Sequence, residues 1–366
     1  MKEKDVQQAD VVSQHDSREN TSADIVDLVE TAVAASGVSS RAMSTKKEGY
    51  RVRTSCRIIV DSCADFAPSI PGLLGVEVIE FAYIDGAEVH YADGWKTQDP
   101  HEFYENMRKH PDKTYTTSAV TPGEYMEIFE RYAKEGIPTI YLSFTAGLSS
   151  SYYAAQQAAD SIREKYPDFE LYVLDNLAPS AAAELLTIEA VRQSARGLTA
   201  REVYDWACDA RYFIHGYFTL DSFDALAAGG RIPPAAAHIG SKLDIKPELT
   251  YDLTGALVLK GMCRGHKKAL RAMLDDFKAE YTGDTSLPIA IVSTDAEKDA
   301  DWLEKAIRKE KDYEKVSIIR SSVSPAIGAH VGPGMVALIF WGTDRRSKVS
   351  LADKIANKVR SRLDGE

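Results

Sequence analysis

The chain has 366 residues, 44% of them hydrophobic and 27% charged, and its formal net charge is −11. These values are typical of a globular protein with room for one large or two ordinary domains, and the acidic balance argues against a nucleic-acid-binding protein. The sequence contains no run of about 18 uncharged apolar residues that could cross a membrane, and its N-terminus lacks the pattern of a signal peptide.

The four cysteines are scattered and form no C-x-x-C pair. In a chain of this length, such cysteines are typical of reduced, mainly structural thiols rather than of disulfides or a metal site. We therefore expect a cytoplasmic protein without a bound metal.

Residues 1–55 are polar and contain few aromatic side chains. Thr21 and Ser22 can cap a short amphipathic helix that carries Ile25 and Leu28 on one face. We expect a flexible N-terminal extension here, and a docking or dimerisation helix is the alternative.

From Arg57 onward, short apolar runs alternate with helical patterns. Thr121, Pro122 and Glu124 form a capping box, so a helix is expected to begin there. Such alternation is typical of a mostly parallel sheet with helices on both faces. We expect strands at residues 57–61, 76–83, 140–145 and 171–175, and helices at 103–108, from 122 onward, at 151–159, 179–195 and 199–211.

The pattern changes at Phe213, where a second group of elements begins. Residues 329–334 are expected to form a tight loop before the last strand. We divide the chain into an extension (1–55), an α/β domain (56–212), a second α/β domain (213–343) and a charged C-terminal helix (344–366). In the second domain we expect strands at 213–220, 289–293, 316–320 and 335–341, a hairpin of 250–253 and 256–262, and helices at 221–228, 266–281 and 299–309.

The stretch from Ile140 to Ala159 is the strongest candidate for a binding site. An apolar strand leads into a hydroxyl-rich loop that contains Thr145 and Ser149, and an Ala-rich helix follows. Hydroxyls and backbone N–H groups at the positive end of a helix can hold an anion without a metal.

Three other segments carry polar groups of the same kind. Thr117 and Ser118 precede the helix at Pro122, where they can face a ligand or merely satisfy turn backbone groups. The glycines before Arg231 allow a close backbone approach, and the arginine supplies a fixed cation. His330 precedes a Gly-Pro-Gly sequence, where a histidine is usually structural.

Together, and in this order, these motifs resemble the DegV family of bacterial fatty-acid-binding proteins over residues 57–342. The resemblance implies an N-terminal three-layer α/β/α domain with a mostly parallel sheet and a C-terminal α/β domain with a mixed sheet. It also implies a long-chain fatty acid held between the domains, by a carrier without catalytic residues, metal or other cofactor. Several members present the acid to a fatty-acid kinase, which links them to phospholipid metabolism. The motifs are 60–65, 117–118, 148–149, 151–152, 229–232, 245–247, 267–270 and 330–334.

The residues that match the family's head-group motifs are Thr117, Ser118, Thr145, Ser149, Arg231 and His330. The resemblance implies that they bind the fatty-acid carboxylate.

The chain departs from the family pattern at several of these motifs. Ala119 and Val120 replace Gln-Pro, Ala146 replaces a serine, and Ser150 replaces a glycine. These changes leave open the exact head-group contacts, and they are compatible with a different acyl class or another acid.

The main alternative is an enzyme that acts on a small acid or phosphorylated ligand, with Asp61, Asp65 and His330 as acid–base groups. Walker-type, Rossmann and zinc-binding spacings are absent from the sequence, and residues 147–151 supply only half of a nucleophile elbow. A regulatory or scaffold role through the acidic surface is a third possibility.

Overall fold

The computed structural model describes residues 54–232 and 245–348. Its first domain is built on a four-stranded parallel sheet in the order β2-β1-β6-β7. The central strand β6 is buried along its whole length, as expected for a sheet that is covered on both faces. The strands are β1 (Arg57–Asp61), β2 (Glu77–Ile79), β6 (Thr139–Ser143) and β7 (Leu171–Asp175).

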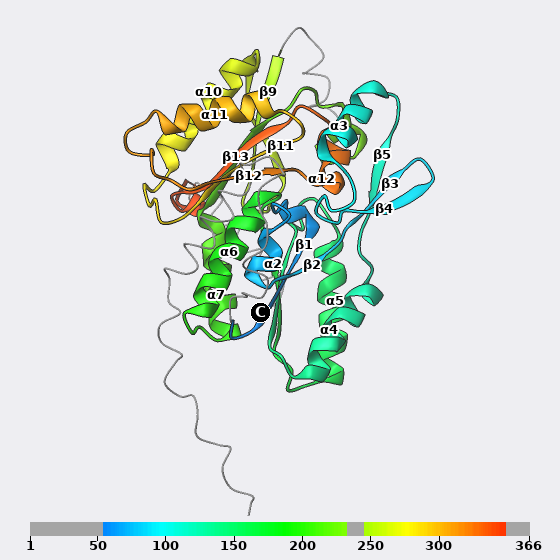
Figure 1. Cartoon of the computed structure of the whole chain (residues 1–366). Coiled ribbons are helices and arrows are strands. Elements are labelled where there is room, and N and C mark those ends of the chain that lie inside the picture. The colour runs from blue at the N-terminus through cyan, green and yellow to red at the C-terminus, as the bar shows by residue number, and fades with distance from the viewer. Residues whose placement is uncertain (1–53, 233–244, 349–366) are drawn as a thin grey trace, which may run out of the picture.

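Helices cover both faces of this sheet, with α4 and α5 on one side and α6 and α7 on the other (Figure 1). The predicted capping box at the start of α4 is confirmed, because Thr121 Oγ1 accepts from Glu124 N at 3.3 Å and Glu124 Oε2 accepts from Thr121 N at 2.7 Å. The three-layer arrangement expected from the sequence is therefore present. The helices are α4 (Pro122–Glu135), α5 (Ser151–Lys165), α6 (Ala181–Ala195) and α7 (Ala200–Ala210).

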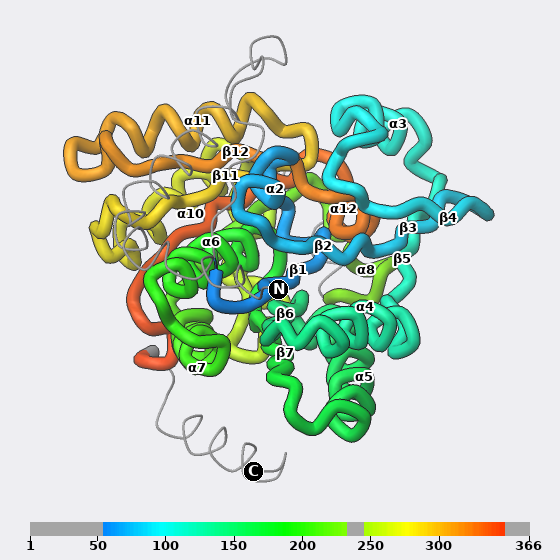
Figure 2. The backbone as a smooth tube through the Cα atoms, turned by 60° about the horizontal axis from the view of Figure 1, so that its bottom comes forward, coloured from blue at the N-terminus to red at the C-terminus, as the bar shows by residue number. Residues whose placement is uncertain are grey.

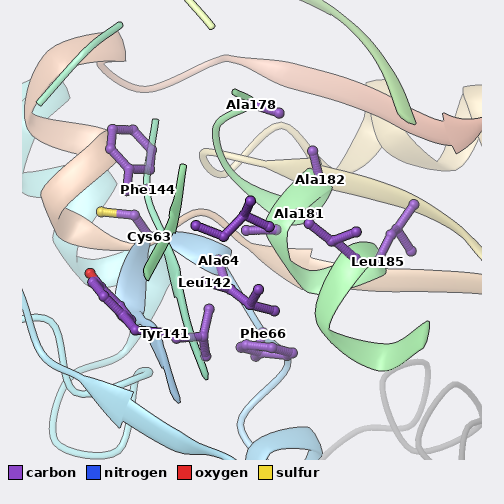
Figure 3. Packing of buried hydrophobic residues seen from close by; sticks show 14 of the residues in the cluster. Cys63, Ala64, Phe66, Tyr141, Leu142, Phe144, Ala178, Ala181, Ala182 and Leu185 are labelled. Carbon is purple, nitrogen blue, oxygen red and sulfur yellow. The ribbon is translucent and has the colours of Figure 1, made fainter. Parts of the chain in front are cut away.

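Helix α6 belongs to both domains, since it packs against the parallel sheet on one side and against β8, β11 and β13 on the other. Nearly all of its side chains are buried. Figure 3 shows Ala181, Ala182 and Leu185 packed against Ala64 and Leu142 at the ends of the parallel strands. Small side chains on α6 allow this close approach of helix and sheet.

The second domain contains a six-stranded mixed sheet in the order β10-β9-β8-β13-β11-β12. Only the β11–β12 pair is parallel, and the predicted hairpin is confirmed as β9 and β10. Helices α10 and α11 cover one face, and the opposite face turns toward the first domain (Figure 2). The elements are β8 (Ile214–Thr219), β9 (Ile245–Tyr251), β10 (Leu257–Arg264), α10 (His266–Glu280), β11 (Ile289–Ser293), α11 (Glu297–Arg308), β12 (Ile318–Ser322) and β13 (Val336–Trp341).

A third, three-stranded antiparallel sheet was not expected from the sequence. The single strand predicted at 76–83 is wrong, because the chain leaves the parallel sheet after Ile79 and starts a new strand at Ala82. This small sheet and α3 enclose an aromatic cluster with Tyr83, Phe103 and Tyr104. Its strands are β3 (Ala82–Asp85), β4 (Glu88–Tyr91) and β5 (Tyr115–Ser118), and α3 is Pro100–Lys109.

The tight loop predicted at 329–334 is also partly wrong, because the helix α12 (Pro325–Val331) contains its first three residues. Gly328 lowers the apparent helical tendency of this segment. The glycine is needed, however, because a Cβ there would lie 2.5 Å from the Tyr104 hydroxyl. The remaining short elements are η1 (Ser62–Ala64), α2 (Ile70–Leu74), η2 (Arg211–Phe213), α8 (Asp224–Ala228) and η3 (Arg345–Lys348).

The predicted N-terminal amphipathic helix lies outside the described residues. Of the predicted C-terminal helix, only the first residues are described, and they form the 3₁₀ turn η3. Within residues 54–232 and 245–348, none of the helices is both long enough and apolar enough to cross a bilayer.

Candidate functional site

A cavity of about 280 Å³ lies where the carboxyl ends of the parallel strands meet the second sheet. Residues from the segments that follow the four strands line it: Cys63 in η1 after β1, Phe81 after β2, Phe144 after β6, and Ser180 beyond β7. Figure 3 shows Cys63 and Phe144 at this end of the parallel sheet. Open α/β sheets bind their ligands outside the carboxyl ends of their strands. This cavity therefore lies at the place where folds of this kind bind their ligands.

The face of the mixed sheet supplies the apolar floor of the cavity. Phe218 of β8 lies opposite Ala337 of β13, and Gly216 lies opposite Ile339. Alternate residues of a strand share a face, so these four residues form one continuous surface. The intervening residues of β13 face α10 and α11 instead.

Five of the six predicted head-group residues line this cavity, and they come from four different segments. Thr117 and Ser118 lie on β5, Ser149 precedes α5, Arg231 follows α8, and His330 lies on α12. Only the tertiary fold brings these segments together.

Thr145 does not line the cavity, which differs from our expectation. Its side chain is fully buried, and its Oγ1 accepts from Gly147 N at 3.1 Å. A Cβ on Gly255 would collide with the same hydroxyl oxygen. Thr145 therefore holds the tip of the β9–β10 hairpin against the first domain.

The closest contact within the polar group joins Thr117 and His330. Thr117 Oγ1 and His330 Nε2 are 2.8 Å apart, whereas His330 Nδ1 is buried and has no hydrogen-bond partner among the described residues. A Cβ on Gly229 would collide with Nδ1, so the predicted close backbone approach at this glycine is present. The bond shows that the Thr117 hydroxyl does more than satisfy turn backbone groups.

His330 is neutral at pH 7. Burial lowers its pKa to about 4, and the positive charge of Arg231 acts in the same direction. One ring nitrogen therefore carries a proton and the other a lone pair, so the ring can donate or accept a hydrogen bond but adds no charge to the site.

Arg231 joins two segments of the wall. Its Nε donates to Leu148 O at 3.3 Å, and its Nη1 donates to Gly229 O. In the described part of the chain no group accepts from Nη2. The guanidinium thus keeps a donor for a ligand while its position stays fixed.

The serines near α5 are held in place by local hydrogen bonds, despite one departure from the family pattern. Ser149 Oγ lies 3.1 Å from Ser151 Oγ and accepts from Ser151 N at 3.2 Å, which fixes the first turn. Ser150 has a φ of −79°, so its backbone conformation does not require the family's glycine. Among the described residues, Ser118 Oγ makes only a long contact of 3.5 Å with Ala119 O.

Asp61 and Asp65 do not line this cavity. Asp61 accepts from Phe144 N at 2.6 Å and from Tyr141 Oη at 3.1 Å, and burial raises its pKa to about 7. Both carboxyl groups act within the protein, where they hold strand-end loops. The enzyme alternative therefore loses two of its three acid–base groups.

Asp65 in particular ties together the starts of two helices. It accepts from Ser180 Oγ at 2.5 Å, at the start of α6, and from Ser324 N at 2.7 Å, at the start of α12. Ser180 has a φ of +61°, an unusual value for a residue other than glycine. Burial raises the pKa of Asp65 to about 7.

The sequence interpretation missed the cavity's apolar lining, which includes Gly216, Phe218, Tyr251 and Met335. The alternation of residues along β8 and β13 indicates which residues share a face, but it does not reveal which face lines a cavity. Across residues 54–232 and 245–348, no three His, Cys, Asp or Glu side chains are grouped so that they could hold a metal ion.

Comparisons with known proteins agree with this architecture. A family model described as an uncharacterised protein of the DegV family matches residues 55–342. A DegV domain-containing protein of Clostridium perfringens is 32% identical over 287 residues, which cover 78% of this chain and 97% of that protein.

Two solved structures share the two-domain fold. One, described as showing fatty acid binding of a DegV family protein from Thermus thermophilus, is 22% identical with a TM-score of 0.68, covering 78% of this chain and 99% of its own. The other, the Streptococcus pneumoniae fatty acid kinase (Fak) B3 protein loaded with linoleic acid, is 23% identical with a TM-score of 0.68, covering 78% and 98%.

Proposed function

Since this chain belongs to the DegV family, we propose that it binds a long-chain fatty acid between its two α/β domains and acts as a carrier without catalysis of its own. We assign residues 56–212 and 213–343 to these domains. The observation that carries the proposal is the cavity itself, whose floor is apolar and whose hydroxyl, guanidinium and imidazole groups come from segments outside the mixed sheet.

The apolar floor supplies most of the affinity in this proposal. Each buried methylene contributes about 0.8 kcal/mol, so an acyl chain of roughly 14 methylenes gains on the order of 10 kcal/mol before the losses on binding. Burial of the carboxylate costs several kcal/mol unless hydrogen bonds compensate for the lost water. The polar group at the cavity is suited to supply these bonds.

We assign the carboxylate contacts to the hydroxyls of Thr117, Ser118 and Ser149 and to Nη2 of Arg231. Hydrogen bonds to an ionised carboxylate are about twice as strong as neutral ones. Neutral His330 orients the Thr117 hydroxyl by donating from Nε2 to its oxygen, so that the hydroxyl proton is free for the carboxylate. These donors bind and orient the acid but do not activate it.

The head-group end of the cavity is open to the surface, because Ser118 and Ser150 are exposed as well as lining the cavity. A carboxylate bound there is accessible to a second protein. This geometry supports presentation of the acid to a fatty-acid kinase, the enzyme that is named in the description of the Streptococcus pneumoniae relative. The four free cysteine thiols are compatible with a carrier that works in the cytoplasm.

Mass spectrometry of the denatured, purified protein tests the proposal. We expect an aliphatic acid in near-stoichiometric amount. An empty cavity together with turnover of a small phosphorylated compound would instead favour the enzyme alternative.

A further inference from the structure

The β9–β10 hairpin forms one wall of the cavity, where Tyr251 and Leu257 lie opposite each other in register. The ring of Tyr251 lies against Gly216 of β8. A Cβ on Gly216 would lie 2.6 Å from Tyr251 Cε1 and 3.3 Å from its hydroxyl oxygen. Only a glycine at position 216 leaves room for the ring in this orientation.

The Tyr251 ring is held from several directions. Its hydroxyl donates to Ile214 O at 3.1 Å, and the Arg345 guanidinium stacks over the ring with its carbon 4.6 Å from the ring centroid. Arg345 Nη1 also donates to Tyr251 O at 3.2 Å. Since the side chain is 5% exposed, the ring forms a fixed part of the wall.

The hairpin is itself fixed to the first domain. A Cβ on Gly147 would lie 2.6 Å from Ala256 N, and Thr145 is packed equally tightly against Gly255. The hairpin tip is therefore wedged against the loop that follows β6. A ligand cannot push this wall outward without separating the two domains.

The floor of the cavity leads to this ring. Met335, which precedes β13, lines the cavity together with Ala337 and Ile339 of β13. Ile339 lies opposite Gly216, against which the Tyr251 ring packs. The four residue-to-residue steps from 335 to 339 span about 14 Å at the rise of a strand. An extended acyl chain covers this length with about 11 carbon–carbon bonds, because each bond of roughly 1.5 Å advances the zigzag chain by only about 1.3 Å.

We propose that the Tyr251 ring, seated on Gly216, limits the length of the acyl chain that the cavity accepts. This inference rests on the fatty-acid binding proposed above. Chains that fit between the polar group and the ring are retained, and longer chains have to bend or leave the floor of the sheet.

Replacement of the ring by a smaller apolar side chain tests the limit. In Tyr251→Leu, we expect the mean length of the bound acid to increase by about two carbons, because the substitution frees roughly 3 Å along the floor. The purified variant is stripped of lipid, incubated with equal amounts of saturated acids of different lengths, and analysed by mass spectrometry.

Tyr281→Leu is the matched control. Tyr281 packs on Phe277 and Phe340 at the opposite face of the same sheet, and its hydroxyl donates to Asp284 O at 3.0 Å. The control loses the same ring and the same kind of hydrogen bond. We expect its bound acids to match those of the wild-type chain.

Gly216→Ala tests the same wall in the opposite direction. The added methyl group pushes the Tyr251 ring into the cavity, so we expect shorter bound acids. The double variant Gly216→Ala/Tyr251→Leu relieves this clash and is expected to return the length distribution toward that of the wild type. If Gly216→Ala alone fails to fold, the length distribution bound by the double variant still tests the role of this wall.

The outcomes separate this inference from the proposed function. A wild-type chain that binds none of the acids refutes fatty-acid binding and the length limit with it. A wild-type chain that binds acids refutes the length limit alone if Tyr251→Leu leaves their distribution unchanged, or if Tyr281→Leu shifts it equally.

Discussion

The contact between Thr117 and His330 gives the sharpest test of the head-group assignment. In Thr117→Val, the β-branched shape suited to strand β5 is kept, while the hydroxyl that we assign to the carboxylate is lost. The substitution also removes the partner of His330 Nε2, which is 2.8 Å away in the wild type.

The magnitude follows from the type of bond. A hydrogen bond to a charged group contributes about 1.5–3 kcal/mol. Since about 1.4 kcal/mol corresponds to a tenfold change, we expect the dissociation constant for the fatty acid to rise by roughly 10- to 100-fold. The apolar tail is untouched, so weak binding remains.

Titration with a fluorescent fatty acid measures this change, and thermal unfolding checks that the variant is folded. Thr116→Val is the matched control, since Thr116 is the preceding residue of the same strand, is exposed and does not line the cavity. If Thr117→Val binds as tightly as Thr116→Val, the assignment of this hydroxyl to the carboxylate is wrong.

Three further predictions concern His330, Gly229 and Asp65. The lipid-free wild type should lose about 2 kcal/mol of unfolding free energy between pH 7 and 5 through His330, because its pKa is lowered from 6.5 to about 4 and only the unfolded chain takes up the proton in this window. In chemical denaturation, His330→Gln should lack this pH-dependent loss. An equal loss in both proteins would contradict the prediction. Gly229→Ala should weaken acid binding at least tenfold in the same titration by displacing His330, whereas Gly230→Ala, with no atom within 4 Å but a φ of +69°, should lower only the stability. Asp65→Ala should reduce the unfolding free energy by about 2–4 kcal/mol, because it leaves the buried groups at the starts of α6 and α12 unpaired; an unchanged melting temperature would refute its structural role.

Local patterns were sufficient for much of the fold. The capping residues Thr121 and Glu124 predicted the start of α4, and the alternation of apolar runs with helices predicted a parallel sheet. These features depend on neighbouring residues, which is why a single sequence reveals them. The split of the predicted strand at 76–83 was missed, because the choice between two sheets depends on partners distant in the chain.

The sequence by itself determined which residue types are available for a binding site: hydroxyls at Thr117 and Ser149, a cation at Arg231 and an imidazole at His330. Only the tertiary structure decided their use, because it gathers four distant segments around one cavity and turns Thr145 away to hold a hairpin. It also decided that the Tyr251 ring packs against Gly216. Residue chemistry and local periodicity are encoded along the chain, whereas a cavity is the space that long-range packing leaves unfilled.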